Sequence, residues 1–378
     1  MSLLKSRFIE LFGSTDLSLQ KDDWVEIKNI GEVVSGSTPK TTNESYWGGE
    51  NKWITPAELS SNTYVITKTD RYLTDEGVKS CSLRKLPKDT VLLTSRAPIG
   101  KVAIAGTEMY CNQGFKNIIC NEKIRPKYLF YLLKNNVRYL EYLGRGATFK
   151  EISKSIVENV KIPLFPLQDQ DRFIEFAEQI DKSKFLLQQI LKKLELLKKS
   201  RFIEMFKNSE TLRLDQIAEV TMGQSPDSSS YNSVGKGIPF YQGKTEFTDK
   251  YIGQPSTWCT SPTRIAKEND ILMSVRAPVG NVNIATEECC IGRGLSSIRP
   301  QNGFNSEFIF EALEQKKEEL ENKATGSTFK AINKDIVLSI QIPNTSISIQ
   351  KEYSNFVKQI DKSKLIIQKA LEDLVGKV

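Results

Sequence analysis

The chain has 378 residues, enough for two domains that each bury a hydrophobic core. Its net charge of +7 suits an anionic partner, but an ordinary mixed-charge surface gives the same balance. The sequence contains no histidine, and its six cysteines show no C-x-x-C spacing, so we expect no metal, no cofactor and no catalysis through an imidazole. No apolar run approaches the roughly 20 residues of a membrane span and no signal peptide is visible. These features predict a cytoplasmic protein that does not enter a membrane.

The sequence is an imperfect internal repeat. The segment G-A-T-F-K from Gly146 recurs as G-S-T-F-K from Gly326, and Q-I-D-K-S-K from Gln179 recurs from Gln359, both 180 residues later. The N-terminal block K-S-R-F-I-E-L-F from Lys5 recurs near the end of the first copy, from Lys199. The second copy stops where that block would follow. We therefore predict that residues 1–21 form a helical segment that completes the C-terminal helix, so that the repeat closes with approximate two-fold symmetry.

Each repeat begins with a body of mixed strands and helices. In the first body, residues 22–164, we expect these elements in order: a strand at 24–28, a turn at 35–39, strands at 91–94 and 102–105 around the R-A-P-I-G turn at 96–100, a helix near 127–143, a short helix at 148–152 capped by Thr148, and a strand ending at Ile162-Pro163. The second body, residues 211–343, follows the same plan, with an R-A-P-V-G turn at 276–280 and a helix near 306–322. Residues 46–88 and 231–267 barely match. This pattern indicates a common frame with two different reading surfaces.

A long helix follows each body, in residues 165–210 and 344–378. Apolar residues fall at alternating three- and four-residue steps, which is typical of a coiled-coil seam formed by Phe173, Ile180, Leu187, Leu191 and Leu194 in one helix and Ile360, Ile367, Leu371 and Leu374 in the other. We predict that the two helices pair antiparallel as a spacer of roughly 60 Å, at 1.5 Å per residue. The alternative is that each helix packs only on its own body.

Motifs for cofactor binding or catalysis are missing. The segment from Gly237 to Thr245 has five residues between its glycines, where a phosphate-binding loop needs four. The chain has no Pro-Pro pair, which excludes the [N/D]-P-P-[Y/F] tetrad of amino-methyltransferases. We therefore expect a chain without catalytic residues. A self-sufficient DNA methyltransferase or nuclease remains the enzymatic alternative.

Short polar loops recur in both bodies and carry side chains suited to DNA. Arg and Lys can contact phosphates or guanine, and Gln and Asn can pair with adenine. The candidate DNA-binding residues are Thr38, Lys40, Arg96, Lys101, Gln113, Lys116, Thr148 and Lys150 in the first body, and Ser225, Tyr241, Gln242, Arg276, Asn281, Arg293, Thr328 and Lys330 in the second. Trp53, in contrast, is expected in the core.

In the order of these motifs, doubled and with two long helices, the whole chain resembles the specificity subunits of type I restriction–modification enzymes. The motifs that carry the resemblance are the turns at Gly36-Ser37-Thr38-Pro39 and Gly223-Gln224-Ser225-Pro226, the R-x-P-x-G turns, the G-x-T-F-K segments, and the Ile-Pro strands that lead into helix starts at Gln168, Gln170 and Gln350. Ser225 departs from the family pattern, which has threonine there.

The resemblance implies an α+β fold with two pseudo-symmetric target recognition domains separated by two long antiparallel coiled-coil helices. It implies that the domains read the two halves of an asymmetric double-stranded DNA target. It also implies that two methyltransferase (modification) subunits dock on the chain and bring restriction subunits with them, and that S-adenosylmethionine, ATP and Mg²⁺ belong to these partners. The alternative from a different class is a two-lobed protein-binding scaffold that does not recognise DNA.

Overall fold

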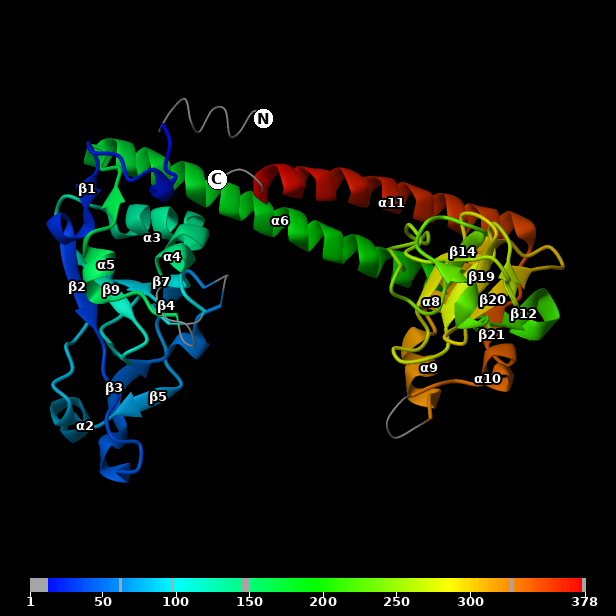
Figure 1. Cartoon of the computed structure of the whole chain (residues 1–378), viewed down its shortest axis with the longest axis horizontal. Coiled ribbons are helices and arrows are strands. Elements are labelled where there is room, and N and C mark those ends of the chain that lie inside the picture. Colours follow the sequence, from blue (N-terminus) through cyan, green and yellow to red (C-terminus); the bar gives the residue numbers. More distant parts are fainter. Residues whose placement is uncertain (1–12, 61–62, 97, 145–149, 326–329, 376–378) are drawn as a thin grey trace. The chain divides into compact units, whose positions relative to one another are not determined.

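The computed structural model describes residues 13–60, 63–96, 98–144, 150–325 and 330–375. Residues 1–12, most of the segment predicted to complete the C-terminal helix, lie outside this part. The chain divides into two compact units: unit 1 comprises residues 1–188 and 369–378, and unit 2 comprises residues 189–368. One helix, α6 (Leu167–Phe206), is continuous over 40 residues and belongs to both units (Figure 1).

Unit 1 contains a five-stranded sheet and a smaller three-stranded sheet. The larger sheet has the order β2-β9-β6-β7-β4, formed by β2 (Gly31–Ser35), β4 (Val65–Ile66), β6 (Val91–Leu93), β7 (Val102–Ala105) and β9 (Lys116–Cys120). The smaller sheet has the order β5-β3-β8, formed by β3 (Trp47–Ile54), β5 (Arg71–Leu73) and β8 (Tyr110–Cys111), and helix α2 (Asp75–Ser80) follows β5. A short antiparallel pair, β1 (Val25–Glu26) with β10 (Lys161–Ile162), joins the two ends of the body. The strand expected at 24–28 ends at Glu26, because a 3₁₀ turn begins at Ile27.

Unit 2 repeats four strands of the five-stranded sheet of unit 1, and its second sheet differs from that of unit 1. Its first sheet, β12-β20-β17-β18, is formed by β12 (Ala218–Met222), β17 (Ile271–Ser274), β18 (Val282–Ile284) and β20 (Leu295–Pro300). The second sheet, β13-β15-β14-β19-β16, is formed by β13 (Tyr231–Asn232), β14 (Ile238–Tyr241), β15 (Trp258–Cys259), β16 (Ile265–Ala266) and β19 (Cys289–Ile291). β11 (Thr211–Arg213) pairs with β21 (Gln341–Pro343), and α7 (Leu214–Ile217) follows β11. The sequence segments that diverge between the repeats thus contribute mainly to the second sheets.

The helices differ from the sequence prediction in two places. The helix expected near 127–143 is broken at Asn136 into α3 (Pro126–Asn135) and α4 (Val137–Leu143), and its counterpart is broken into α8 (Ser306–Glu314) and α9 (Lys317–Lys323). The buried Asn136 side chain accepts a hydrogen bond from Leu17 N (2.8 Å) and donates to Leu132 O (2.8 Å) and Thr15 O (2.9 Å). It therefore ends one helix and also fixes the incoming chain.

The prediction of a short helix at 148–152 was wrong for the residues of this segment that the structure describes. Glu151 is extended and forms a β-bridge with Arg96, and the helix α5 (Lys154–Glu158) begins three residues later. Its N-cap is Ser153, whose hydroxyl accepts a hydrogen bond from Ile156 N at 3.2 Å. The matching helix in unit 2 is α10 (Lys334–Leu338), with Asn333 as its N-cap. Thr148 and Thr328, the expected caps, lie outside the described residues.

Each unit packs the start of its long helix on the helix that follows the sheet. In unit 1, Phe173 and Ala177 of α6 join the core formed by α3, β6 and β7. In unit 2, Tyr353 and Val357 of α11 (Ile347–Val375) take the equivalent positions against α8, together with Phe202 and Phe206 from the end of α6. Two buried glutamines anchor these helix starts: Gln170 bonds Arg125 N, Lys123 O and Phe165 O, and Gln350 bonds Asn305 N, Gly303 O and Thr345 O. Gln170 and Gln350 of the sequence motif are therefore structural, whereas Gln168 is exposed.

Within unit 2, α11 runs antiparallel to the end of α6. Tyr353 OH donates to Lys198 O at 3.3 Å, Arg201 pairs with Glu352 at 3.3 Å, and Lys364 pairs with Glu195. Along the predicted seam, Phe173, Ile180 and Ile360 are buried, whereas Leu187, Leu191, Leu194, Ile367, Leu371 and Leu374 are half-buried. Apolar side chains outside the seam are exposed on the same helices, with Leu196 62% and Leu365 66% accessible.

In each unit an ion pair joins the body to its long helix, and the two charges of the pair are reversed between the units. In unit 1, Lys127 at the start of α3 pairs with Glu178 of α6 at 2.7 Å. In unit 2, Glu307 at the start of α8 pairs with Lys358 of α11 at 3.0 Å. Each residue is 180 positions from its counterpart, so the repeat has kept the contact and exchanged the signs.

Candidate nucleic-acid interface

The Gly36 turn of unit 1 packs directly on the loop that carries Gln113. A Cβ at Gly36 would lie 2.1 Å from Asn112 O, so only glycine permits this approach. The Thr38 hydroxyl donates to the Gln113 side-chain oxygen, and Trp53 Nε1 donates to Ser37 O at 3.1 Å. Trp53 is buried, as expected. These contacts hold the Gly36 turn against the loop that carries Gln113.

Three of the cations predicted in unit 1, Arg96, Lys101 and Lys116, are held by groups of the unit itself. Arg96 Nε donates to Glu151 Oε2 at 3.0 Å, and Lys116 Nζ lies 3.3 Å from Glu151 Oε1 and 3.3 Å from Ser95 Oγ. Partial burial of Glu151 would raise its pKa, but the hydrogen bonds from Arg96 and Lys116 outweigh this and lower the pKa. Lys101 Nζ donates to Leu59 O at 2.6 Å.

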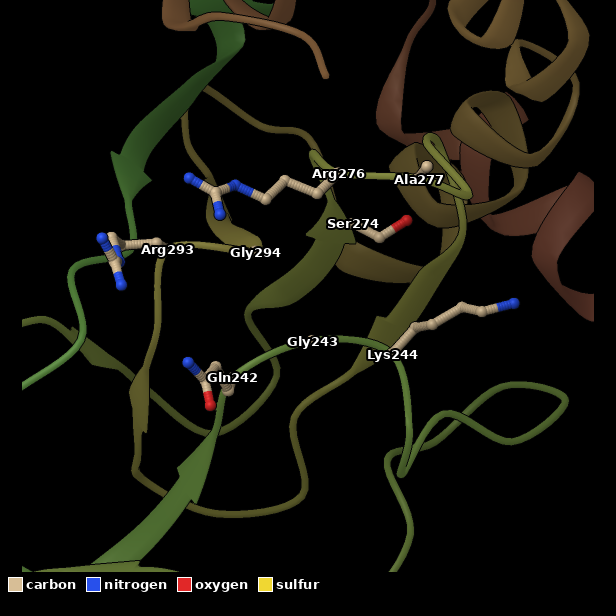
Figure 2. Close-up of a pocket in the computed structure, with 8 residues that line it drawn as sticks. All are labelled: Gln242, Gly243, Lys244, Ser274, Arg276, Ala277, Arg293 and Gly294. Atoms are coloured by element: carbon tan, nitrogen blue, oxygen red, sulfur yellow. The ribbon is translucent and has the colours of Figure 1, made fainter. Parts of the chain in front are cut away.

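The equivalent loops of unit 2 surround a half-open pocket of about 210 Å³. Its lining residues are Gln242, Gly243, Lys244, Ser274, Arg276, Ala277, Arg293 and Gly294, with three cations and no carboxylate. The side chains of Arg276, Arg293 and Lys244 are exposed and make no hydrogen bond or ion pair with any residue that the structure describes. Figure 2 shows the two guanidinium groups and the Gln242 amide on the same side of the pocket, with Lys244 extending the other way.

In unit 2 the Ser225 turn contacts the loop of Arg293, as the Thr38 turn contacts the loop of Gln113 in unit 1. Gly223 approaches Gly292 closely, since a Cβ there would lie 2.2 Å from Gly292 O. The Ser225 hydroxyl accepts a hydrogen bond from the backbone N–H of Arg293 at 3.3 Å. Serine therefore still fastens the turn to the polar loop, and it leaves the Arg293 side chain unengaged. Asn281 Nδ2 donates to Pro278 O at 3.0 Å within the R-A-P-V-G turn.

Two predicted site residues are buried and act as supports. Tyr241 is 1% exposed in the core of the second sheet, its hydroxyl donates to Gly253 O at 3.0 Å, and burial raises its pKa. Lys116 is 7% exposed and faces Glu151. Neither side chain is placed to touch a ligand. Lys40, Lys150 and Lys330 are exposed.

Lys244 and Glu151 were missed by the sequence analysis. Lys244 lies in the segment that diverges between the repeats, where no pairing pointed to it. Glu151 could have been found by comparing the copies, because Lys116 and Glu151 of unit 1 correspond to Ser296 and Ala331 of unit 2. A cation and an anion that disappear together indicate an ion pair.

Other kinds of site find no support in the described residues. The segment that superficially resembles a phosphate-binding loop forms β14, and no helix begins in residues 242–250. Across the described ranges, no cluster of three potential metal ligands occurs. None of the helices traced in these ranges is long and apolar enough to cross a membrane.

Comparisons with known proteins agree with this arrangement. The family described as "Type I restriction modification DNA specificity domain" matches twice, over residues 21–196 and 207–375. The chain is 33% identical to the putative type I restriction enzyme MjaX specificity subunit of Methanocaldococcus jannaschii, over 97% of this chain and 95% of that protein. It is 40% identical to the MjaIX specificity subunit of the same organism, but this match covers 57% of the chain and 52%, about half, of that relative.

Solved structures give the same result. One, from a study of complex assembly and conformational transition of the type I R-M system, matches with a TM-score of 0.72 and 26% identity, over 93% of this chain and 94% of that one. The HsdS subunit of Thermoanaerobacter tengcongensis matches with a TM-score of 0.52 and 26% identity, over 93% of each chain. With both halves matched by the same family, the chain belongs to the specificity subunits of type I restriction–modification enzymes.

Proposed function

We propose that this chain reads a split, asymmetric DNA target, with residues 22–164 and 211–343 as its two recognition domains and residues 165–210 and 344–378 as spacer helices. The observation that carries the proposal is the pocket of unit 2, which gathers three cations without a carboxylate. Two of these cations, Arg276 and Arg293, lie on loops that both repeats share. Such a pocket suits an anionic ligand. The second sheets, where the repeats diverge, are the natural place for different base sequences to be read.

Mapping adenine methylation in the source genome, with and without this gene, tests the proposal and gives the target. Replacing residues 22–164 by the corresponding domain of another such subunit is expected to change one half-site only. A change in both half-sites, or in neither, contradicts separate reading by two domains. Lengthening both spacer helices by one turn is expected to widen the gap between half-sites and leave their sequences unchanged.

We further propose that two methyltransferase subunits dock on the long helices and bring restriction subunits with them. The exposed apolar side chains of these helices support this, since exposed apolar patches mark interaction sites. Leu365 and Ile366 are 66% and 61% accessible. Leu365→Glu or Ile366→Glu is expected to abolish co-purification with the methyltransferase, whereas Lys79→Glu, an exposed charge change on α2, is expected to retain it. Equal binding by all three variants would exclude this surface.

The chain itself is proposed to be non-catalytic and cytoplasmic. Duplex DNA binding is best measured with the methyltransferase present, because the partner contributes to affinity. Phosphate contacts impose a steep dependence on salt. A complex whose binding to duplex DNA is weak and insensitive to salt would instead favour the protein-binding scaffold.

A further inference from the structure

The two units each have an arginine at the same position of the repeat, but the side chains around it differ. Arg96 and Arg276 begin equivalent R-A-P-x-G turns, and each forms a β-bridge with the residue that follows the shared lysine, Glu151 in unit 1 and Ala331 in unit 2. The backbone frame is therefore conserved between the units. The difference is in the side chains around the arginine.

In unit 1, the arginine has an internal counter-ion. Glu151 is shared by Arg96 Nε at 3.0 Å and Lys116 Nζ at 3.3 Å. The equivalent residues in unit 2, Ser296 and Ala331, carry no charge, so Arg276 has neither a carboxylate beside it nor a competing lysine. Ser296 is buried, and its hydroxyl finds no partner among the described residues.

We propose that Arg276, with Arg293, forms a subsite for one DNA phosphate in unit 2, and that Glu151 closes the equivalent subsite in unit 1. The inference rests on the proposed function and deepens it. A guanidinium group without an internal acceptor offers its N–H donors to the two oxygens of an external phosphate. A guanidinium bonded to Glu151 has already lost part of that attraction, so unit 2 supplies the larger electrostatic share of binding.

A phosphate fits better than a base edge, because the arginine is common to both repeats. Two domains that read different bases gain nothing from an identical base contact at the same turn. Phosphate contacts position a protein on the duplex without carrying sequence. The conserved turn therefore serves positioning, and the divergent second sheets serve reading.

Exchanging the two arrangements tests the proposal without changing the net charge. The pair Ser296→Lys with Ala331→Glu gives unit 2 the groups of unit 1, and the pair Lys116→Ser with Glu151→Ala does the reverse. The full chain, in complex with its methyltransferase subunits, is titrated with a mixed-sequence DNA duplex over a range of salt concentrations. Each phosphate contact contributes a slope of about −0.9 in log K against log salt, which amounts to about eightfold in affinity for a tenfold change in salt, such as from 1 M to 0.1 M.

The Ser296→Lys/Ala331→Glu pair is expected to lower the magnitude of the salt slope by about 0.9 and affinity by about eightfold at 0.1 M salt. The Lys116→Ser/Glu151→Ala pair is expected to raise both by similar amounts. Arg276→Gln alone is expected to reproduce the loss, and it keeps the test valid if the buried Lys at position 296 prevents folding. Adding Arg276→Gln to the unit 2 pair should cause no further loss, since both act through the same side chain.

Three results would overturn the proposal. If the unmodified complex binds steeply with salt but Arg276→Gln leaves the slope unchanged, the subsite is wrong and the proposed function stands. If Arg276→Gln weakens binding only to duplexes with one particular base pair, the arginine reads a base edge and the phosphate assignment fails. If the unmodified complex shows no salt-dependent binding to any duplex, the proposed function itself fails.

Discussion

A buried ion pair in unit 2 offers a quantitative test of how the long helix is fastened. Lys198 of α6 lies 3.0 Å from Glu311 of α8, and their side chains are only 11% and 2% exposed. Burial raises the pKa of Glu311, although Lys198 opposes the shift. At an effective dielectric constant of about 20, two charges 3 Å apart attract by roughly 5–6 kcal/mol, which is partly offset by the cost of removing both from water.

Glu311→Gln or Lys198→Met is therefore expected to destabilise unit 2 by about 3–5 kcal/mol, because the remaining charge stays buried without its partner. The double variant Lys198→Met/Glu311→Leu is expected to recover most of this loss, since apolar side chains can fill the space without a charge. The matched control is Lys358→Gln. It removes a pair of the same 3.0 Å length between α11 and α8 whose lysine is 56% exposed, and we expect a loss below about 1 kcal/mol.

Hydrogen exchange followed by mass spectrometry measures the effect locally in the full chain, where unfolding of two units is not a single transition. Peptides from α8 should exchange at least about a hundredfold faster in each single variant, since 1.4 kcal/mol is tenfold. Peptides from α3 of unit 1 should not change. If the two single losses simply add in the double variant, Lys198 and Glu311 are not energetically coupled and the reasoning fails.

Three further outcomes follow from the packing. Asn136→Ala removes the two hydrogen bonds that hold Thr15 and Leu17, and we expect the free energy of opening measured by exchange at Leu17 N to fall by roughly 2 kcal/mol, whereas unchanged exchange would mean that the Leu17 side chain alone anchors the segment. Gly36→Ala is expected to lower the melting temperature of unit 1, since its Cβ would lie 2.1 Å from Asn112 O, whereas Gly243→Ala, with open space around it, should be neutral. The hydrogen bond from Lys127 lowers the pKa of Glu178 below its ordinary 4.5, so its contribution to stability is present above that pH and lost as pH falls through the folded-state pKa. Glu178→Gln should therefore flatten acid unfolding as the pH falls below 4.5, and an unchanged acid transition would contradict this role.

The doubling of the fold could be predicted because it is written twice in the sequence. The R-A-P-x-G turns, the long helices and the Ile-Pro ends of the bodies recur at a fixed offset, and local pattern and repeat agree there. The break at Asn136 could not be predicted, since the apolar periodicity continues across it. The helix is broken at the same place in unit 2, at Lys316, so the break belongs to the shared frame; in unit 1 the Asn136 side chain uses it to bond Thr15 and Leu17, more than 100 residues away.

The site was predicted in composition but not in detail. Both faces of β14 are buried, with Phe240 4% and Tyr241 1% exposed, so Tyr241, predicted as a DNA-binding residue, lies in the core. The short helix at 148–152 was expected from local capping, but residues 150–152 follow the bridge between Glu151 and Arg96 instead. In both cases a tertiary contact overrides a local preference. The contact between Glu151 and Arg96 also decides whether that arginine is free.

The charge-reversed pairs, Lys127 with Glu178 and Glu307 with Lys358, limit how such a chain can evolve by recombination. If the two bodies exchanged long helices, Lys127 would face Lys358 and Glu307 would face Glu178, and both like-charge contacts would be repulsive. Each body therefore matches the charge of its own helix, although an exposed pair of this kind contributes at most about 1 kcal/mol. A crossover between related genes would preserve this match only when it carries a body and its helix together, so new specificities would arise by exchange of whole halves or of the second sheets alone.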